Sequence, residues 1–386
     1  MERLTKLKFN RHGNKKLIAI DGPPGTGKTT EILKRAMAWD EAGAVVTFTN
    51  AAAQVLKDRS QGEITAGTIY SLSWPCVKKS TGSKQTHGNK ASGSWTKRKV
   101  KSTWDTALSD YTDAAPSKKG RTDLDQIASE IHSWDGTGDP PHDLKELNPV
   151  RELKYVLPLA RWVSLGCPGE HEDKFPAILV DEAQDMSALE MAATLGLSDG
   201  KVTAFLDPGQ SIFASAKGIG DALPPAWVSA AERFRLNGGH RIGTPASTTA
   251  SMVLSSYFNR PPQTFTKTGV TTIVEPWEPA EGPPPRGLVL GYSRAIVRKY
   301  FELWDLEDTG LVPGQGNTDN ELILSTIHSA KGSEAKDVYL LPWGTKALDK
   351  LELSEPNELR LLYVALTRGS SYIRLPWSIW TMLDYF

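Results

Sequence analysis

Short apolar runs alternate with amphipathic stretches in two parts of the chain. The first series of runs, each predicted to be a strand, comprises 17–20, 44–49, 177–180 and 201–206, with a helix predicted over 29–39. The second series comprises 287–291, 321–325, 338–341 and 372–375. Strands that are apolar on both faces and alternate with helices are typical of a parallel sheet covered on both sides. The pattern therefore predicts an α/β protein with two parallel-sheet domains.

The pattern lapses in the middle of the first series. Residues 75–104 contain eight Lys or Arg and no Asp or Glu, while 105–150 are acidic and indicate helix only in pieces. We interpret 75–175 as an insertion. The basic stretch, which includes Trp95, fits equally an arm that follows nucleic-acid phosphates and a solvated loop.

The chain of 386 residues is too long for one ordinary core, which agrees with two domains. We expect the first domain to comprise 1–74 and 176–230, and the second to comprise 231–386. Residues 261–285 are rich in proline and polar residues and are predicted to be a connecting segment with little helix.

Charge and cysteine usage narrow the class of protein. Lys+Arg and Asp+Glu are both 45, so no global field attracts nucleic acid. Cys76 and Cys167 form no metal-ligand spacing, which favours a reducing compartment. There is no apolar run of the roughly 20 residues needed to cross a bilayer, and no signal-type segment follows the charged start. We expect a soluble protein of the cytoplasm, either a cellular one or a phage-encoded one acting in its host.

The segment after the first predicted strand has the spacing of a nucleotide-binding P-loop, Gly22-Pro23-Pro24-Gly25-Thr26-Gly27-Lys28-Thr29. Its glycines let the backbone approach phosphates, and the following helix points its positive end at them. Lys28 is expected to neutralise phosphate charge, and Thr29 to ligate Mg²⁺. The expected ATP contacts in this loop are Gly22, Pro23, Gly25, Thr26, Gly27, Lys28, Thr29 and Thr30.

An acidic pair, Asp181-Glu182, directly follows the strand predicted over 177–180. Asp181 is placed to hold Mg²⁺ through water, and Glu182 to orient or deprotonate the attacking water. The alternative is that these residues merely cap the next helix. The P-loop upstream favours the catalytic interpretation.

Near the C-terminus, Leu359, Leu362 and Leu366 recur at helical spacing, so one face of this helix is predicted to be buried. Arg368 ends the helix just before Gly369, where helices commonly stop. An arginine there is usually a partner of the helix dipole. With a nucleotide site elsewhere in the chain, it also fits an arginine finger, which can be worth about 10³ or more in rate.

Further segments resemble, in order, the motifs of superfamily 1A helicases of the UvrD, Rep and PcrA type. They are 46–53 (VTFTNAAA, motif Ia), 67–71 (GTIYS, Ib), 206–213 (LDPGQSIF, III), 236–241 (LNGGHR), 326–334 (TIHSAKGSE, V) and 358–368 (VI). No single one of them is decisive, but their common order is specific. The resemblance covers most of the chain outside the insertion.

The resemblance implies two RecA-like domains, the first with a 1B-like insertion and the second of the 2A type. It assigns Gln210, Arg241 and Arg368 to catalysis beside Lys28, Asp181 and Glu182. Gly332, Glu334 and Tyr363 are implied to lie near the nucleotide. The implied DNA contacts are Thr49, Asn50, Thr68, Tyr70, Phe213 and His328.

The chain departs from this family in three places. The glutamine that reads adenine has no counterpart in 8–14, and Ser215 stands where a base-stacking tryptophan is usual. Phe213, Tyr70 and Tyr257 are candidates for the missing ring. Only about 26 residues separate Arg294 from the motif V strand, so the accessory 2B domain is expected to be minimal or absent, at about 295–320.

We therefore expect an ATP-dependent translocase and helicase on single-stranded DNA, with 3′→5′ polarity implied by the resemblance. Expected partners are single-stranded DNA or a single-strand/duplex junction, and replication or repair proteins. We expect a monomer that binds no membrane. An RNA-directed helicase and a nucleotide-gated regulator that binds single strands and hydrolyses slowly remain alternatives.

Overall fold

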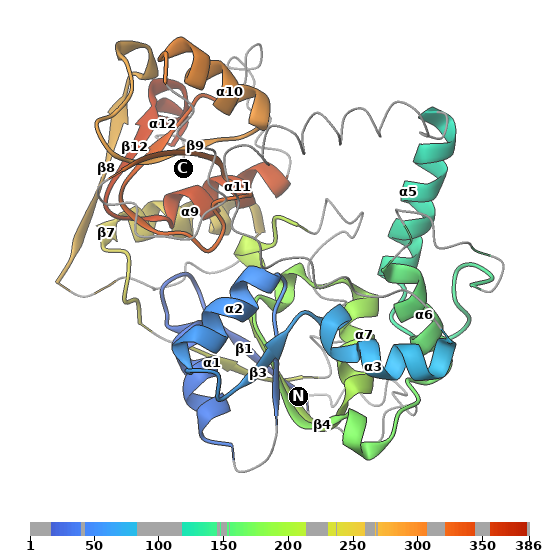
Figure 1. The fold of residues 1–386 in the computed structure, drawn as a ribbon. Coiled ribbons are helices and arrows are strands. Elements are labelled where there is room, and N and C mark those ends of the chain that lie inside the picture. Colours follow the sequence, from blue (N-terminus) through green and yellow to red (C-terminus); the bar gives the residue numbers. More distant parts are fainter. Residues whose placement is uncertain are drawn as a thin grey trace.

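The described part of the protein forms two α/β domains, each built on one six-stranded sheet (Figure 1). The computed structural model describes residues 17–39, 43–82, 118–144, 147, 153, 155–213, 231–236, 238–258, 267, 269–306, 321–343 and 356–383. Every strand pair in both sheets is parallel. The prediction of an α/β protein with two parallel sheets is confirmed.

The first sheet has the order β3-β2-β4-β5-β1-β6. Its strands are β1 (Leu17–Asp21), β2 (Ala44–Val46), β3 (Thr65–Gly67), β4 (Phe175–Val180), β5 (Ser198–Leu206) and β6 (Glu232–Arg235). Its helices are α1 (Lys28–Met37), α2 (Asn50–Arg59), α3 (Ile69–Thr81), α5 (Lys118–Ser133), α6 (Val156–Ser164) and α7 (Ala188–Leu197). Ile18 and Ile20 belong to the core under α1 and α2, whereas Ala19 belongs to the core under the other helices. This alternation explains why the strand is apolar throughout.

Two features of the first domain differ from the sequence-based expectation. Helix α5 is continuous over 16 residues where we expected helix only in pieces, and Ile131 at its C-terminal end shares one core with Leu157 of α6 and Leu189 of α7. Strand β6, which we had placed in the second domain, pairs with β1 and extends the first sheet. Its side chains are exposed on this edge, so it lacks the apolar signature of the other strands.

The second sheet has the order β10-β9-β11-β12-β8-β7. Its strands are β7 (Thr244–Pro245), β8 (Thr271–Trp277), β9 (Gly287–Gly291), β10 (Leu322–Thr326), β11 (Ala335–Leu340) and β12 (Gly369–Pro376). Its helices are α9 (Ala246–Phe258), α10 (Arg294–Leu303), α11 (Pro356–Leu366) and α12 (Trp377–Leu383). Val289 faces α10 and its neighbours Leu288 and Leu290 face the opposite core, so this sheet is also apolar on both faces.

Strand β8 lies inside the segment that we expected to be a connection. Thr271 to Val274 are β-branched and suit a strand, but Pro276 argued against one. Within the described residues β8 pairs with β12 from Ile273 to Trp277 and with β7 only at Thr271 and Thr272. Pro276 is therefore near an open edge, where the lack of an N–H donor is tolerated.

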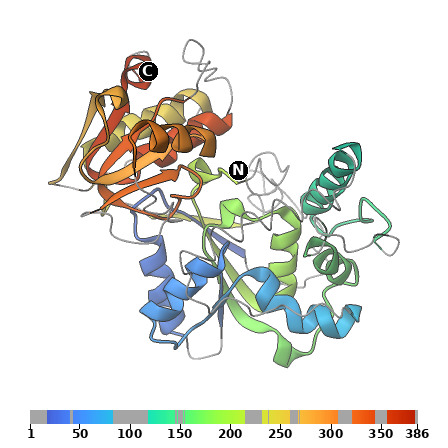
Figure 2. The same cartoon turned by 45° about the horizontal axis from the view of Figure 1, so that its top comes forward.

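Helix α5 lies at the end of the first domain remote from α1 in both views (Figures 1 and 2). The second domain covers the part of the first that lies near α1 and α2. Among the described helices, none combines the length and the apolar character needed to span a membrane. The expectations about 8–14, Trp95, Ser215 and the later part of the 295–320 interval fall outside the described residues.

Candidate nucleotide site between the two domains

Three adjacent strands of the first sheet end at one place. β4, β5 and β1 are neighbours, and their carboxyl ends lead into Asp181, Asp207 and Gly22. The N–H of Gly22 donates to the carbonyl of Leu206 at 2.9 Å, which ties the start of the P-loop to the end of β5. Ligands of open α/β sheets bind at such carboxyl edges. The sheet thus gathers the predicted P-loop, acidic pair and motif III.

The P-loop folds around its own lysine. Gly25 and Gly27 have φ angles of 71° and 82°, a conformation that favours glycine. Lys28 Nζ donates to the carbonyls of Gly22 at 2.5 Å and Pro23 at 3.4 Å. Helix α1 begins at Lys28 with no side-chain cap. Its first-turn N–H groups are therefore available to an anion, as the sequence predicted.

The acidic pair is buried and its two carboxyls behave differently. Burial, and then the charge of Glu182, raise the pKa of Asp181 well above its usual range. Burial also acts to raise the pKa of Glu182, but Lys331 and then Lys28 more than offset it and hold that pKa low. Glu182 therefore stays ionised, and Asp181 is the carboxyl of the pair that takes up a proton more readily.

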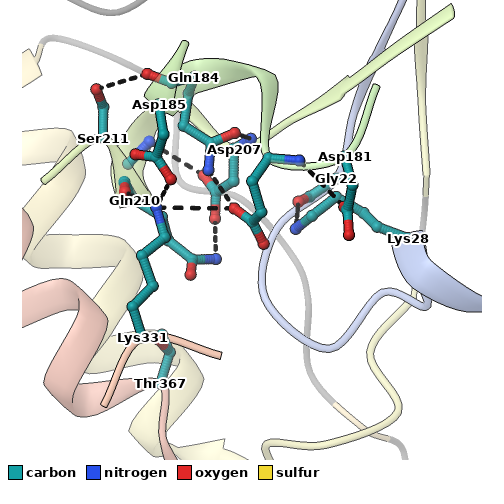
Figure 3. Close-up of polar contacts among 12 residues, drawn as sticks. Gly22, Lys28, Asp181, Gln184, Asp185, Asp207, Gln210, Ser211, Lys331 and Thr367 are labelled. Atoms are coloured by element: carbon teal, nitrogen blue, oxygen red, sulfur yellow. Dashed lines mark hydrogen bonds and ion pairs between the residues drawn. The ribbon is translucent and has the colours of Figure 1, made fainter. Parts of the chain in front are cut away.

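A hydrogen-bond network joins the acidic pair to motif III (Figure 3). Gln184 donates to a carboxylate oxygen of Glu182, and its Oε1 accepts from the N–H of Asp207 at 3.0 Å. Asp207 Oδ2 in turn accepts from Gln210 Nε2 at 2.8 Å. Gln210 was assigned a role from the sequence, but Gln184 and Asp207 were not. Asp207 lies within the quoted motif III segment and Gln184 lies two residues after the acidic pair, and these positions were the only signals.

Arg368 crosses from the second domain and is buried, with 2% of its surface exposed. Its Nη2 donates to Gln210 Oε1 at 2.9 Å, its Nε to the Val364 carbonyl at 3.0 Å and its Nη1 to the Ser333 carbonyl at 3.4 Å. Burial, and then the neighbouring Arg241, lower its pKa to about 10. The side chain remains charged at neutral pH. It both caps α11 and reaches the first domain.

Arg241 lies against the P-loop. A Cβ atom added to Gly25 would be 2.6 Å from the Cβ of Arg241, and the N–H of His240 donates to the Gly25 carbonyl at 2.8 Å. Arg241 forms an ion pair with Glu334 and donates through Nη1 to the Thr367 carbonyl at 3.4 Å. Its Nε is buried and has no hydrogen-bond partner in the described part of the chain.

Lys331 is an interdomain contact that the sequence analysis did not single out. Its Nζ lies 2.5 Å from Asp185 Oδ2, 2.5 Å from the Gln210 carbonyl oxygen and 3.7 Å from Glu182 Oε2. It also lies 5.5 Å from the ring centre of Phe213. One lysine of the second domain therefore touches both the acidic loop and the motif III loop.

Among the residues that the structure describes, a cavity of about 1420 Å³ lies between the two domains. Its first-domain wall includes Gly25, Gly27, Lys28, Thr29, Thr30, Asp181, Glu182 and Gln210. Its second-domain wall includes His240, Arg241, Gly332, Ser333, Glu334 and Arg368. Tyr363, expected near the nucleotide, is instead buried and donates to Asp207 Oδ2 at 3.2 Å.

The residues present fit a bound Mg²⁺–nucleotide. Lys28, Arg241 and Arg368 are among the cations that line the cavity, together with Thr29 and Asp181. Among the described residues, no group of three or more His, Cys, Asp or Glu is placed to hold a metal ion. Because Mg²⁺ is commonly held by one or two protein groups together with phosphate oxygens and water, Thr29 and Asp181 suffice on the protein side.

Three aromatic rings on the wall of the cavity contact one another. Phe213 stacks on Phe48 at 5.1 Å between ring centres and meets His328 edge-on at 5.8 Å. All three residues, and Thr49, line the cavity. Phe213, His328 and Thr49 were assigned to DNA from the resemblance. Phe48 was not, although it lies in the quoted motif Ia segment.

The other assigned DNA contacts, Asn50, Thr68 and Tyr70, are not among the residues that line this cavity. Thr68 caps helix α3 through its hydroxyl. The Tyr70 ring packs on the core and edge-on against Tyr155, and its hydroxyl hydrogen-bonds to Glu190. Burial, and then Glu190, raise the pKa of Tyr70 well above its usual range. Tyr70 is therefore a core residue here and does not present a free ring for stacking.

Comparisons with known families cover both domains. The family described as AAA domain matches residues 8–216, more than half of the 386-residue chain, and the UvrD-like helicase C-terminal domain matches 322–375. The RecBCD enzyme subunit RecB of Chlamydia muridarum (strain MoPn / Nigg) is 33% identical over 87 residues, which are 21% of this chain and 8% of that protein.

Solved helicase structures align along most of the chain. A PRRSV helicase gives a TM-score of 0.45 at 16% identity, over 93% of this chain and 52% of its own. Arterivirus nonstructural protein 10 (helicase) gives a TM-score of 0.42 at 16% identity, and the alignment covers 95% of this chain and 60% of that one. The structure of its complex with DNA gives a TM-score of 0.41 at 14% identity, with 95% of this chain and 62% of that one covered. The chain thus spans only part of the length of these relatives. From the two family matches, this chain belongs to the superfamily 1 helicases of the UvrD type.

Proposed function

We propose that the protein is an ATP-driven motor that translocates on single-stranded DNA in the 3′→5′ direction and unwinds duplex weakly. The observation that carries this proposal is the shared cavity, in which Lys28 of one domain faces Arg241 and Arg368 of the other. A nucleotide clamped between two domains links each cycle of binding and hydrolysis to a change in their separation. The polarity comes from the resemblance in motifs.

Six residues of the cavity have a place in phosphoryl transfer: Lys28, Thr29, Asp181, Glu182, Arg241 and Arg368. Bound Mg²⁺–ATP supplies the phosphoanhydride bond that is broken. Lys28, Arg241 and Arg368 stabilise the charge on the phosphate oxygens, which is the main catalytic contribution in this reaction class. Ionised Glu182 accepts a hydrogen bond from the attacking water and takes its proton. Thr29 and Asp181 would hold the metal.

Contacts across the cleft suggest how chemistry is coupled to the strand. Gln210 accepts from Arg368 through its side chain and from Lys331 through its backbone. Lys331 also lies beside Phe213, which belongs to the aromatic cluster. A shift of the second domain that moves Arg368 therefore also moves contacts at Phe213. We propose that Phe48, Phe213 and His328 meet the bases of the strand.

The wider assignments follow the same proposal. The first domain would comprise 1–74 and 176–236, with 75–175 as its insertion, and the second would comprise the chain from 238. Helix α10 lies in the interval of about 295–320 that we expected to hold a minimal 2B segment, but it packs on the second sheet, so we assign it to the second domain. We propose a monomer that binds single-stranded DNA or a junction in the cytoplasm, of its own cell or of a phage host, and works with replication or repair proteins.

The experiment is an NTPase assay with no polymer, with single-stranded DNA and with single-stranded RNA, followed by displacement of streptavidin from either end of the strand. The proposal predicts stimulation by DNA and clearing of one end only. Stimulation by RNA alone would make it an RNA-directed helicase. Slow NTP turnover and no displacement of streptavidin, in a protein that still binds the single strand, would make it a nucleotide-gated regulator.

A further inference from the structure

The hydroxyl of Ser333 is a buried polar group without a hydrogen-bond partner. Ser333 is 4% exposed, and its Oγ makes no hydrogen bond to any residue that the structure describes. A buried hydroxyl left unpaired costs free energy comparable to a lost hydrogen bond, so such groups need an explanation. Ser333 lines the interdomain cavity. The explanation is therefore to be sought in what the cavity binds.

The backbone around Ser333 is fixed on both sides. Its N–H donates to the Ala330 carbonyl at 2.9 Å, and its carbonyl accepts from Arg368 Nη1 at 3.4 Å. Gly332 before it has a φ of 90°, which sets the turn that carries Ser333 into the wall. Only the hydroxyl is left unsatisfied. The position is thus preorganised, with one donor to spare next to the arginine that crosses the cleft.

The surroundings define the chemistry of the missing partner. Arg368 lies against Ser333, and Arg241 is close enough to Arg368 to lower its pKa. A site with two arginines attracts an anionic oxygen, and a hydroxyl can add one O–H donor to it. Because Ser333 is on the second-domain wall, opposite the P-loop that surrounds Lys28, the hydroxyl is placed for the end of the nucleotide that reaches across the cleft.

We infer that Ser333 Oγ donates a hydrogen bond to the terminal phosphate of a bound nucleoside triphosphate. This inference rests on the proposed function, because it requires a nucleotide in the cavity. It adds a neutral ligand to the arginines of the second-domain wall. The contact is made with a triphosphate and absent with a diphosphate, so Ser333 helps the second domain to distinguish the two.

The test compares Ser333→Ala with the unaltered protein for binding of ADP and of a non-hydrolysable ATP analogue, by calorimetry and by melting temperature. We expect about tenfold weaker binding of the analogue, the weight of one hydrogen bond to a charged group, with ADP binding unchanged. Without nucleotide the variant should melt at the same or a higher temperature, because it loses an unpaired buried hydroxyl. If the hydroxyl had a purely structural role, the variant would instead melt at a lower temperature than the unaltered protein.

Ser329→Ala is the matched control. Ser329 lines the same cavity, but its hydroxyl already accepts from Thr326 Oγ1 at 3.0 Å. Unchanged analogue binding by Ser333→Ala, or an equal loss for ADP and the analogue, would overturn the inference. Failure of the unaltered protein to bind either nucleotide would instead overturn the proposed function, so the two failures are distinguishable.

Discussion

The two walls of the cavity are built in different ways. The first-domain wall centres on one continuous loop, in which Lys28 is held by carbonyls only five and six residues away. The second-domain wall brings together Arg241, Ser333 and Arg368, which are far apart in sequence, and its Arg368 donates to Gln210 across 158 residues. A local wall can bind phosphate by itself. A wall assembled from distant segments is complete only when the domains are in register.

This difference separates nucleotide binding from turnover. The P-loop, with its helix N-terminus and its lysine, contains the main determinants of phosphate binding within a single loop. The arginines of the other wall contribute to the transition state only when that wall approaches. Loss of Lys28 from the first wall should therefore abolish the reaction, whereas loss of Arg241 or Arg368 from the second should reduce its rate and leave binding of nucleotide largely intact.

The largest effect is expected for Lys28→Ala. Loss of this buried cation removes the charge that faces the phosphates, so NTP turnover should fall below detection while single-strand binding persists. Lys34→Ala, on the exposed face of the same helix, is the control and should behave like the unaltered protein. Turnover that survived in Lys28→Ala, measured as phosphate release, would show that the site is wrongly assigned.

Arg368→Ala is expected to lower the turnover number by about 10³, the usual weight of an arginine finger, with little change in nucleotide affinity. Because Arg368 is buried and also caps α11, melting curves must accompany the kinetics, and Arg368→Lys keeps the charge with less loss of packing. Arg286→Ala, at a second-domain arginine with 58% side-chain exposure, is the control. If a folded Arg368→Ala variant kept the turnover number of the unaltered protein, Arg368 would not be an arginine finger.

The same contrast explains what the sequence could predict. The P-loop and the acidic pair were found because each lies within a few residues after an apolar strand, where strand and loop have local signatures. The ion pair of Lys331 with Asp185 spans 146 residues, and no local pattern specifies which acidic residue the lysine will meet. The roles given to Arg241 and Arg368 came from the resemblance in motifs. The residues themselves left the alternative of a helix cap open for Arg368.

The misjudged elements follow a similar rule. Strand β8 was missed because Pro276 is a local signal against strands, and only the pairing shows that it lies near an open edge. Strand β6 was assigned to the wrong domain because its exposed side chains have no apolar alternation. Both errors concern strands that are open along most or all of one side, where tertiary neighbours decide more than propensity does.

A smaller effect, on single-stranded DNA affinity alone, is expected for Phe213→Ala. Removing a ring that stacks on a base costs about 1–3 kcal/mol of single-strand affinity, whereas turnover without a polymer should stay near that of the unaltered protein. Fluorescence anisotropy with a labelled strand measures the first, and phosphate release the second. Phe234→Ala, at an exposed ring on β6 outside the cavity, is the control. If Phe213→Ala and Phe234→Ala bound single-stranded DNA equally well, the aromatic cluster would not be a contact of the DNA.

The smallest functional effect is expected for Tyr70→Phe, which sharpens the contrast between cavity and core. The change deletes the hydroxyl that bonds to buried Glu190 and keeps the ring, so the free energy of unfolding should fall by about 1–3 kcal/mol. Strand affinity and DNA-stimulated turnover should not change, because Tyr70 is not among the residues that line the cavity.

Tyr155→Phe, at the half-exposed partner ring, should cost less stability because its surroundings are more open to water. Urea unfolding monitored by tryptophan fluorescence compares the two variants, and anisotropy checks the strand. If Tyr70→Phe instead weakened strand binding without lowering stability, the tyrosine would be a nucleic-acid contact, as the resemblance in motif Ib implied. The geometry favours the first outcome, because a hydroxyl already bonded to a buried carboxylate could reach a base only by breaking that bond.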